Sequence, residues 1–135
     1  MTAFFDTNIL VYAFASREPK RDTAQGVLAL GGVISVQVVN EFAFVLRKKQ
    51  RQEWPRIEAA LTVVERWLET IRPLTLDTHR AALPLARDGG IGFYDALIVA
   101  AAIEAGCDRI YSEDLQDGQK FGDCLVVNPF REGKF

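Results

Sequence analysis

The chain has 135 residues, 49% of them hydrophobic, and a formal net charge of −2 at pH 7. This length and apolar content suit one packed domain and are too small for two ordinary ones, so we expect residues 1–135 to form a single domain. Apolar runs fall short of the about 20 residues that a membrane-spanning helix needs. The first residues also lack the basic stretch of a signal peptide, so we expect a cytoplasmic protein with no membrane partner.

Short apolar segments alternate along the chain with longer segments whose apolar residues recur at helical spacing. The predicted order is a strand over 3–5, helices to about residue 30, a strand at 33–34, helices over 35–51 and 55–70, a strand at 74–76, helices over 80–87 and 95–103, and strands at 109–111 and 125–127. Strands that alternate with helices favour a parallel sheet covered on both faces. The sequence therefore predicts an α/β fold.

Asp6 follows directly after the first predicted strand and precedes a predicted helix. Ligands of open α/β sheets gather at the carboxyl ends of the strands, so Asp6 lies at a favoured position for a site. The alternative is a structural one, because Asp is also a preferred N-cap that satisfies the free N–H groups of a helix start. Asp6 alone does not decide between the two.

Glu41 belongs to the predicted helix over 35–51 and lies in its apolar stripe, three residues after Val38 and four before Val45. A carboxylate that faces the core is costly unless it is paired or bound to a metal ion. A buried ion pair with an arginine is the structural alternative. Either way, Glu41 is expected to have a cationic partner.

Two further acids occupy comparable positions. Asp95 opens a helix that is apolar on all faces, although an acid in a first turn also suits the helix dipole. Asp114 follows the predicted strand at 109–111, as Asp6 follows the first strand. Asp117 is a fifth candidate, in a stretch that also fits an ordinary turn.

Carboxylates at these positions indicate a site for a hard metal ion. Mg²⁺ prefers oxygen ligands and keeps several waters, so neither His nor Cys is required. The single histidine, His79, is expected at the surface. Cys107 and Cys124 lack partner cysteines for a zinc site and are expected to be reduced packing residues.

The segments that contain the four acids resemble the motifs of PIN-domain ribonucleases, in particular the VapC-like toxins of type II toxin–antitoxin systems. In chain order they are Phe5-Asp6-Thr7-Asn8-Ile9-Leu10, Asn40-Glu41-Phe42, Tyr94-Asp95-Ala96-Leu97-Ile98-Val99-Ala100 and Tyr111-Ser112-Glu113-Asp114-Leu115. The resemblance extends from Phe4 to about Pro129. It implies a PIN-like three-layer sandwich with a central parallel sheet of about five strands and helices on both faces.

The resemblance also implies an activity, a cofactor and partners. The implied reaction is hydrolysis of RNA phosphodiester bonds by an endoribonuclease with one or two Mg²⁺ or Mn²⁺ ions. The implied partners are an RNA substrate, a VapB-like antitoxin that covers the acidic site, and a second copy of the chain in a homodimer. The catalytic and metal-binding residues would be Asp6, Glu41, Asp95 and Asp114, supported by Thr7, Asn8, Ser112 and Asp117.

A net charge of −2 does not attract RNA over long distances, so binding would need local positive charge. Basic residues lie one to three turns beyond Glu41 on the same predicted helix and could hold phosphates. They are Arg47, Lys48, Lys49 and Arg51. The alternative is a solvated helix end whose cations complement the helix dipole.

The rival function is a catalytically idle PIN-like module that binds RNA or protein. The aromatic residues in 42–44 and in the predicted helix over 55–70 exceed the needs of one small core, which is compatible with a protein interface. Acids are intact at all four motif positions, however, and idle clustered carboxylates would only repel one another. The sequence therefore favours an active enzyme.

Overall fold

The computed structural model describes residues 2–16, 19–68 and 70–131. In these residues, strands form one sheet in the order β3-β2-β1-β4-β6-β5. All neighbours are parallel except β5, which pairs antiparallel with β6. The strands are β1 Ala3–Phe5, β2 Val33–Ser35, β3 Thr70–Arg72, β4 Arg109–Tyr111, β5 Lys120–Phe121 and β6 Cys124–Val127. The predicted α/β fold is confirmed, and β5 adds a sixth strand to the five parallel ones expected.

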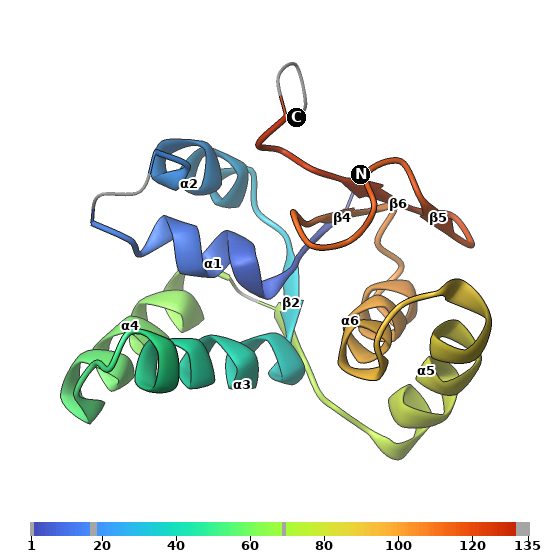
Figure 1. Ribbon diagram of the computed structural model, residues 1–135, viewed down its shortest axis with the longest axis horizontal. Helices are drawn as coiled ribbons and strands as arrows, with labels where there is room; N and C mark the ends of the chain where they lie inside the picture. Colours follow the sequence, from blue (N-terminus) through green and yellow to red (C-terminus); the bar gives the residue numbers. More distant parts are fainter. Residues whose placement is uncertain (1, 17–18, 69, 132–135) are drawn as a thin grey trace.

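The helices cover both faces of the sheet. In Figure 1, α1 to α4 lie to the left of β2, whereas α5 and α6 lie to its right. The helices are α1 Thr7–Ala13, α2 Arg21–Ala29, α3 Val36–Phe44, α4 Trp54–Trp67, α5 Leu76–Gly89 and α6 Phe93–Glu104, and a π-helical turn over Val45–Lys49 continues α3. The predicted three-layer arrangement is confirmed. No helix in the described ranges is long and apolar enough to cross a bilayer.

The strands that pair with β1 lie on both of its sides. Through α1 and α2 the chain reaches β2 on one side of β1, and after α5 and α6 it reaches β4 on the other side. The carboxyl ends of β1 and β4 therefore flank a topological switch point, the usual ligand-binding position in open α/β sheets. The residues that follow these two strands are Asp6 and Ser112, and the Asp6 N–H donates to the Tyr111 carbonyl at 3.0 Å.

The predicted strand at 74–76 is wrong. The side chain of Thr75 accepts a hydrogen bond from the Thr78 N–H at 3.1 Å and thereby caps α5, which begins at Leu76. A threonine that caps a helix competes directly with extended structure at the same position. The third strand lies earlier, at Thr70–Arg72, in a segment expected to end the preceding helix, and α4 instead stops at Trp67.

The core consists of the sheet and the helix faces turned toward it. Residues 96–102 of α6 are buried on every face because α6 packs against both the sheet and α5, as its continuous apolar run predicts. Cys107 and Cys124 are buried free thiols, and burial raises their pKa values to about 11 and about 12, respectively. Both are packing residues, as expected, and His79 lies exposed on α5.

Candidate active site

Asp6 combines the two roles between which the sequence did not decide. As the N-cap of α1, its Oδ1 accepts a hydrogen bond from the Thr7 N–H at 2.7 Å. Its Oδ2 accepts from the Ser112 hydroxyl at 2.6 Å and from the Asn8 Nδ2 at 3.2 Å. Asp6 is 3% exposed, and all three of these partners are neutral donors. The carboxylate is thus held by hydrogen bonds without a counter-charge among them.

The surroundings make ionisation of Asp6 unfavourable. Burial raises its pKa to about 7, although the hydrogen bonds from Ser112 and the Thr7 N–H oppose the rise. The charges of Asp95 and Asp114 raise the pKa further, which places both carboxylates close enough to repel Asp6. A positive charge that enters among these acids would relieve the repulsion.

Glu41 is hydrogen-bonded to α1, the helix that Asp6 caps. Its Oε1 accepts from the Thr7 hydroxyl at 3.0 Å, and its Oε2 accepts from the Gln37 amide at 2.9 Å, one turn earlier on α3. Among the ion pairs of the described residues, none involves Glu41, so the alternative of a buried pair with an arginine is not found. Half-buried Asp95 faces Glu41 from α6. Burial, then the charges of Glu41 and Asp114, raise the pKa of Asp95.

Asn8 joins the acids that follow β1 and β4. Its Nδ2 lies 3.2 Å from Oδ2 of Asp6 and 3.2 Å from Oδ2 of Asp114. Its Oδ1 accepts from the Glu113 N–H at 3.1 Å, which holds the segment after β4 against α1. One amide side chain thereby fixes two carboxylates that lie 108 positions apart in the sequence numbering, from 6 to 114.

Surface hollows meet at the acids. A hollow of about 530 Å³ borders Glu41 and Asp95, a second of about 420 Å³ borders Glu41 and Asp114, and a third of about 420 Å³ borders Asp95 and Asp114. Each acid of this trio therefore separates two hollows. The structure brings together all four carboxylates that the sequence singled out, with the buried Asp6 beneath the other three.

The donor set fits Mg²⁺ or Mn²⁺. It consists of oxygen atoms, and the buried Asp6 carboxylate has neutral hydrogen-bond partners and acidic neighbours. In the described part of the chain, no three potential ligands are grouped tightly enough to enclose an ion directly. Mg²⁺ retains several waters and is usually bound through one or two carboxylates, so a closed set of protein ligands is not required. The residues present are thus compatible with a hydrated divalent ion.

Asp117 makes contacts with the segment that follows β6. Its carboxylate accepts from the Asn128 N–H at 2.8 Å and pairs with the Arg131 guanidinium at 3.1 Å. Both partners lie after β6, so Asp117 ties the turn before β5 to the segment that follows the last strand. These contacts favour the structural reading of Asp117.

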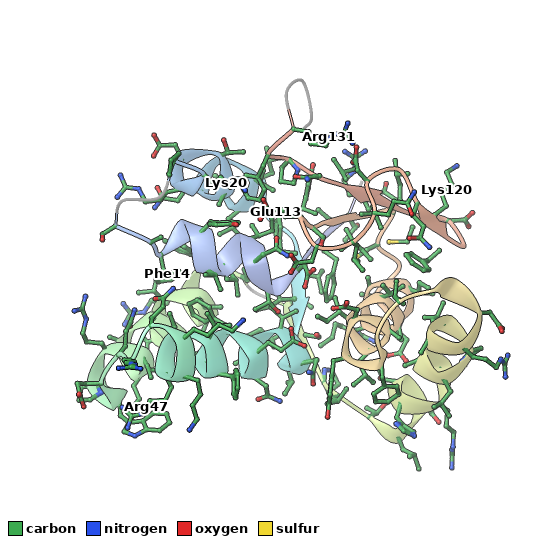
Figure 2. The ribbon with its side chains drawn as sticks, viewed as in Figure 1. Phe14, Lys20, Arg47, Glu113, Lys120 and Arg131 are labelled. Atoms are coloured by element: carbon green, nitrogen blue, oxygen red, sulfur yellow. The ribbon has the colours of Figure 1, made fainter. Side chains whose placement is uncertain are left out.

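The basic residues beyond Glu41 do not act as one cluster. Arg47 turns toward the start of α4, where it donates to the Gln52 carbonyl at 3.1 Å and stacks 4.8 Å from the Trp54 ring centroid. In Figure 2 the Arg47 side chain lies well away from Glu113, at the lower left of the view. Lys49, by contrast, lines the hollow that Glu41 and Asp114 border. Lys48 and Arg51 are exposed.

An ion-pair cluster beside the acids was missed at the sequence level. Lys20 pairs with Glu113 (Figure 2). The Tyr12 hydroxyl donates to the same carboxylate at 2.5 Å. The Lys20 ammonium also lies over the rings of Tyr12 and Phe130, at 5.0 and 5.4 Å from their centroids. Burial raises the pKa of Glu113, but the hydrogen bonds from Lys20 and Tyr12 outweigh it and lower the pKa overall. The cluster holds the residue next to Asp114.

Replacing Ser112 with alanine should destabilise the protein by about 2–4 kcal/mol. The fully buried hydroxyl donates to Asp6 and accepts from the backbone N–H groups of Asp114 and Leu115, both at 3.1 Å. Its loss leaves one carboxylate oxygen and two N–H groups short of a partner. Urea denaturation measures the effect. Thr62→Ala, which removes a hydroxyl from the exposed face of α4, is the matched control and should cost less than about 1 kcal/mol. An equal loss in both variants would contradict the role of Ser112.

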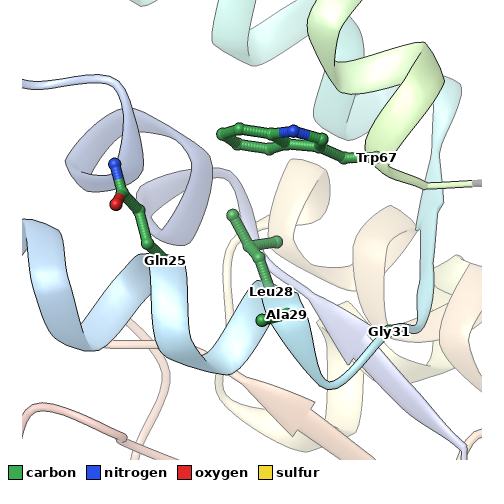
Figure 3. A pocket seen from close by; sticks show the side chains of 5 residues that line it. All are labelled: Gln25, Leu28, Ala29, Gly31 and Trp67. Atoms are coloured by element: carbon green, nitrogen blue, oxygen red, sulfur yellow. The ribbon is translucent and has the colours of Figure 1, made fainter.

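A separate pocket of about 410 Å³ lies between α2 and the end of α4. Figure 3 shows the Trp67 ring spread over Leu28, with Gln25 at the side. Ala29 and Gly31 complete the lining among the described residues, and none of these five side chains is titratable. The chemistry of the molecule is therefore concentrated at the acids and not in this apolar pocket.

The fold and the site define a class of α/β protein that gathers acidic side chains at the switch point of a parallel sheet. A family model described as the PIN domain matches residues 3–116. This chain belongs to the PIN domain family, and the resemblance predicted from the four motifs is confirmed.

Solved structures with the same fold come from toxin–antitoxin systems. A toxin–antitoxin complex from Klebsiella pneumoniae matches with a TM-score of 0.73 at 21% identity, over 96% of this chain and 98% of that one. The sarcin–ricin loop cleaving toxin VapC20 of Mycobacterium tuberculosis matches with a TM-score of 0.69 at 21% identity, over 84% of this chain and 90% of that one. VapBC2 of Rickettsia felis, bound to a promoter DNA fragment, gives 0.68 at 20% identity, over 93% and 97%. A comparison with curated protein sequences gives no significant match.

Proposed function

We propose that this protein is a divalent-metal-dependent endoribonuclease that acts in the cytoplasm as the toxin of a toxin–antitoxin pair. The observation that carries the proposal is the meeting of three carboxylates, Glu41, Asp95 and Asp114, around the buried Asp6, whose hydrogen-bond partners are neutral. Such an arrangement costs stability unless a cation offsets the charge, so it is poorly explained as a purely structural feature. It is well suited to hold a metal ion against a phosphodiester.

The chain's own residues would divide the work. Thr7 and Gln37 hold the Glu41 carboxylate, and Asn8 holds Asp6 and Asp114 at a fixed separation. One or two Mg²⁺ or Mn²⁺ ions, when bound, supply positive charge to the phosphate and lower the pKa of coordinated water. The residues proposed to hold them are Asp6, Glu41, Asp95 and Asp114.

RNA is the proposed substrate. The structural similarity to VapC20, a toxin that cleaves the sarcin–ricin loop, supports this choice. Lys49 lines a hollow that leads to the acids and is placed to meet a phosphate of a strand that lies there. The open hollows beside Glu41, Asp95 and Asp114 suit an extended single strand better than a small enclosed substrate.

The proposed partners are a VapB-like antitoxin and a second copy of this chain. Several similar structures are complexes of a toxin with its antitoxin, which supports the first partner. Exposed apolar side chains, among them Trp54 and Trp67, offer contact surface for either partner. We further propose that residues 1–135 fold as a single domain that carries the contact surfaces for both partners.

Incubation of the purified protein with total RNA tests the proposed function. We expect endonucleolytic fragments with Mg²⁺ or Mn²⁺, no fragments in EDTA, and no fragments from Asp95→Asn, because the site then lacks either its ion or one of its acids. Sequencing of the fragment ends identifies the cleavage site. Binding of RNA without metal-dependent fragments would support the catalytically idle module instead.

A further inference from the structure

The hollow of about 530 Å³ beside Glu41 and Asp95 has features that the four acids do not explain. Its other lining residues are Gln37, Asn40, Phe44 and Tyr94, and we call it the Phe44–Tyr94 hollow. Phe44 is 57% exposed and Tyr94 is 65% exposed, so two aromatic rings stand in solvent next to the acids. Its volume lies within the roughly 300–1,000 Å³ that is typical of small-ligand pockets.

The lining comes from two helices that pack against each other. On α3, positions 37, 40, 41 and 44 follow the spacing of one helix face, so these side chains point the same way. On α6, Tyr94 and Asp95 belong to the first turn. The two helices are in contact, which places the α3 face and the α6 start on opposite sides of the same hollow.

The amides at the hollow differ in availability. Gln37 is buried and donates its Nε2 to Glu41 at 2.9 Å, so it serves the acid. Asn40 lies one turn before Phe44 and is exposed, and within the described residues its side-chain amide takes part in no assigned hydrogen bond. An asparagine amide offers a donor and an acceptor side by side, the pattern that pairs with the edge of a nucleobase.

We propose that the Phe44–Tyr94 hollow binds the nucleobase next to the scissile phosphate, with the aromatic rings stacking on the base and Asn40 reading its edge. This inference rests on the proposed ribonuclease function and adds a specificity site to it. Recognition of single-stranded RNA commonly combines stacking on aromatic side chains with hydrogen bonds to base edges. Because Glu41 and Asp95 border both the hollow and the acid site, a strand whose phosphate lies at the acids continues into the hollow.

A nucleobase fits the hollow better than a second copy of this chain. Two carboxylates form part of the lining, so the group that lies inside the hollow should itself carry no negative charge. A base is uncharged and flat, and it arrives attached to the phosphate that the acids and their ion are proposed to bind. The homodimer is therefore expected to use another face.

Cleavage of matched short RNAs tests the proposal. Once the cut site is mapped, each nucleotide beside it is replaced in turn by an abasic one. For one flanking position, the loss of the base should lower kcat/KM of the wild-type protein by roughly 5- to 150-fold, the effect of one stacked base. Tyr94→Ala should cause a loss of the same size on intact RNA, and a much smaller further loss on the abasic RNA.

The shape of the ring supplies a second criterion. Tyr94→Leu keeps apolar bulk without a flat face, so its kcat/KM on intact RNA should fall as much as that of Tyr94→Ala. The kcat/KM of Tyr94→Phe should fall far less. Asn40→Ala should reduce the preference among the four bases at this position by roughly 5- to 150-fold. Leu30→Ala is the control, because it removes a comparably exposed apolar side chain. Leu30 lies before the amino end of β2, whereas the acids lie at the carboxyl ends of the strands.

Several results would overturn the proposal. Additive losses for Tyr94→Ala and the abasic RNA would show that ring and base do not meet. Equal losses on intact and abasic RNA, together with conversion of a dimer to a monomer in sedimentation, would assign the hollow to an interface between copies. An unchanged base preference in Asn40→Ala would show that Asn40 does not recognise the edge of the base.

Failure of the ribonuclease function gives a different pattern. If the wild-type protein cleaves no RNA with either metal, fluorescence anisotropy of a labelled single-stranded RNA on the Asp6→Asn protein still tests the hollow. Tyr94→Ala in that background should weaken binding of intact RNA by roughly 5- to 150-fold and of a fully abasic strand of the same length by much less. Equal effects on both RNAs would reject base binding independently of catalysis.

Discussion

Replacing Asp6 with asparagine should reduce metal-dependent RNA cleavage by about three orders of magnitude while the fold stays intact. Asparagine still caps α1, because its side-chain oxygen can accept from the Thr7 N–H. The central negative charge of the site is lost, and removal of one preorganised electrostatic group typically costs a factor of about 10²–10³. Initial rates on a defined RNA with Mg²⁺, together with circular dichroism, give the measurement.

Asp88→Asn is the matched control for Asp6→Asn. Asp88 is an exposed acid that pairs with its neighbour Arg87 at 2.8 Å, at the end of α5, so its replacement changes the net charge by the same amount. Its cleavage rate should stay within about twofold of the wild-type rate. If Asp6→Asn kept more than a tenth of the wild-type rate, Asp6 would not be at the reacting centre.

The metal-free protein should lose stability as the pH rises from about 4 to about 7, on the order of 4 kcal/mol in all. The pKa of Asp6 is raised from 3.8 to about 7, mainly by burial and further by Asp95 and Asp114. Between these two values the unfolded chain has released the proton and the folded chain retains it, so stability falls with pH. Below pH 3.8 both states are protonated, and above pH 7 the full cost is present.

Two other acids have shifted pKa values, in opposite directions. Burial and the charge of Glu41 raise the pKa of Asp95, so Asp95 adds to the loss in the same direction. The pKa of Glu113 lies below its ordinary value of 4.5, so its contribution is lost as the pH falls further and leaves the range above pH 5 unaffected.

Urea denaturation in EDTA at pH 5 and pH 8 measures the change. The wild-type protein should be less stable at pH 8, and Asp6→Asn should show a much smaller difference between the two pH values. Mg²⁺ at about 100 times its dissociation constant should restore about 2.7 kcal/mol at pH 8. Greater stability of the metal-free protein at pH 8 than at pH 5 would show that the acids do not repel one another as proposed.

The position of the candidate site was predictable because it follows from a topological rule. Parallel strands place their carboxyl ends at one edge, so acids that follow two strands of the same sheet are expected to meet. Asp6 after β1 and Asp114 after β4 satisfy this rule, and β1 and β4 are neighbours in the sheet. Glu41 was recognised by a second principle, since its position in an apolar helical stripe turns it inward.

Other features depend on contacts that local sequence does not encode. The pairing of Lys20 with Glu113 joins α2's start to the segment after β4, and no pattern within either segment indicates it. The direction of Arg47 is set by Trp54 and Gln52, which the π-helical turn brings within reach. Basic residues were grouped by sequence, whereas side-chain direction separates Arg47 from Lys49.

Local competition explains the errors in the elements. The Leu-Thr-Leu stretch at 74–76 alternates like a strand, but the Thr75 cap begins α5 there. The antiparallel β5 has two residues, too few for an alternating pattern to be recognised. Neither error displaced the site, because the strands and helices that carry its acids were assigned correctly.

Binding of Mn²⁺, measured by isothermal titration calorimetry, tests most directly whether the four carboxylates form one metal site. Single replacements at each acid, namely Asp6→Asn, Glu41→Gln, Asp95→Asn and Asp114→Asn, should each weaken binding at least about tenfold, whereas Asp88→Asn should leave it within about twofold. Wild-type affinity in all four variants, or no binding by the wild-type protein, would contradict a shared metal site.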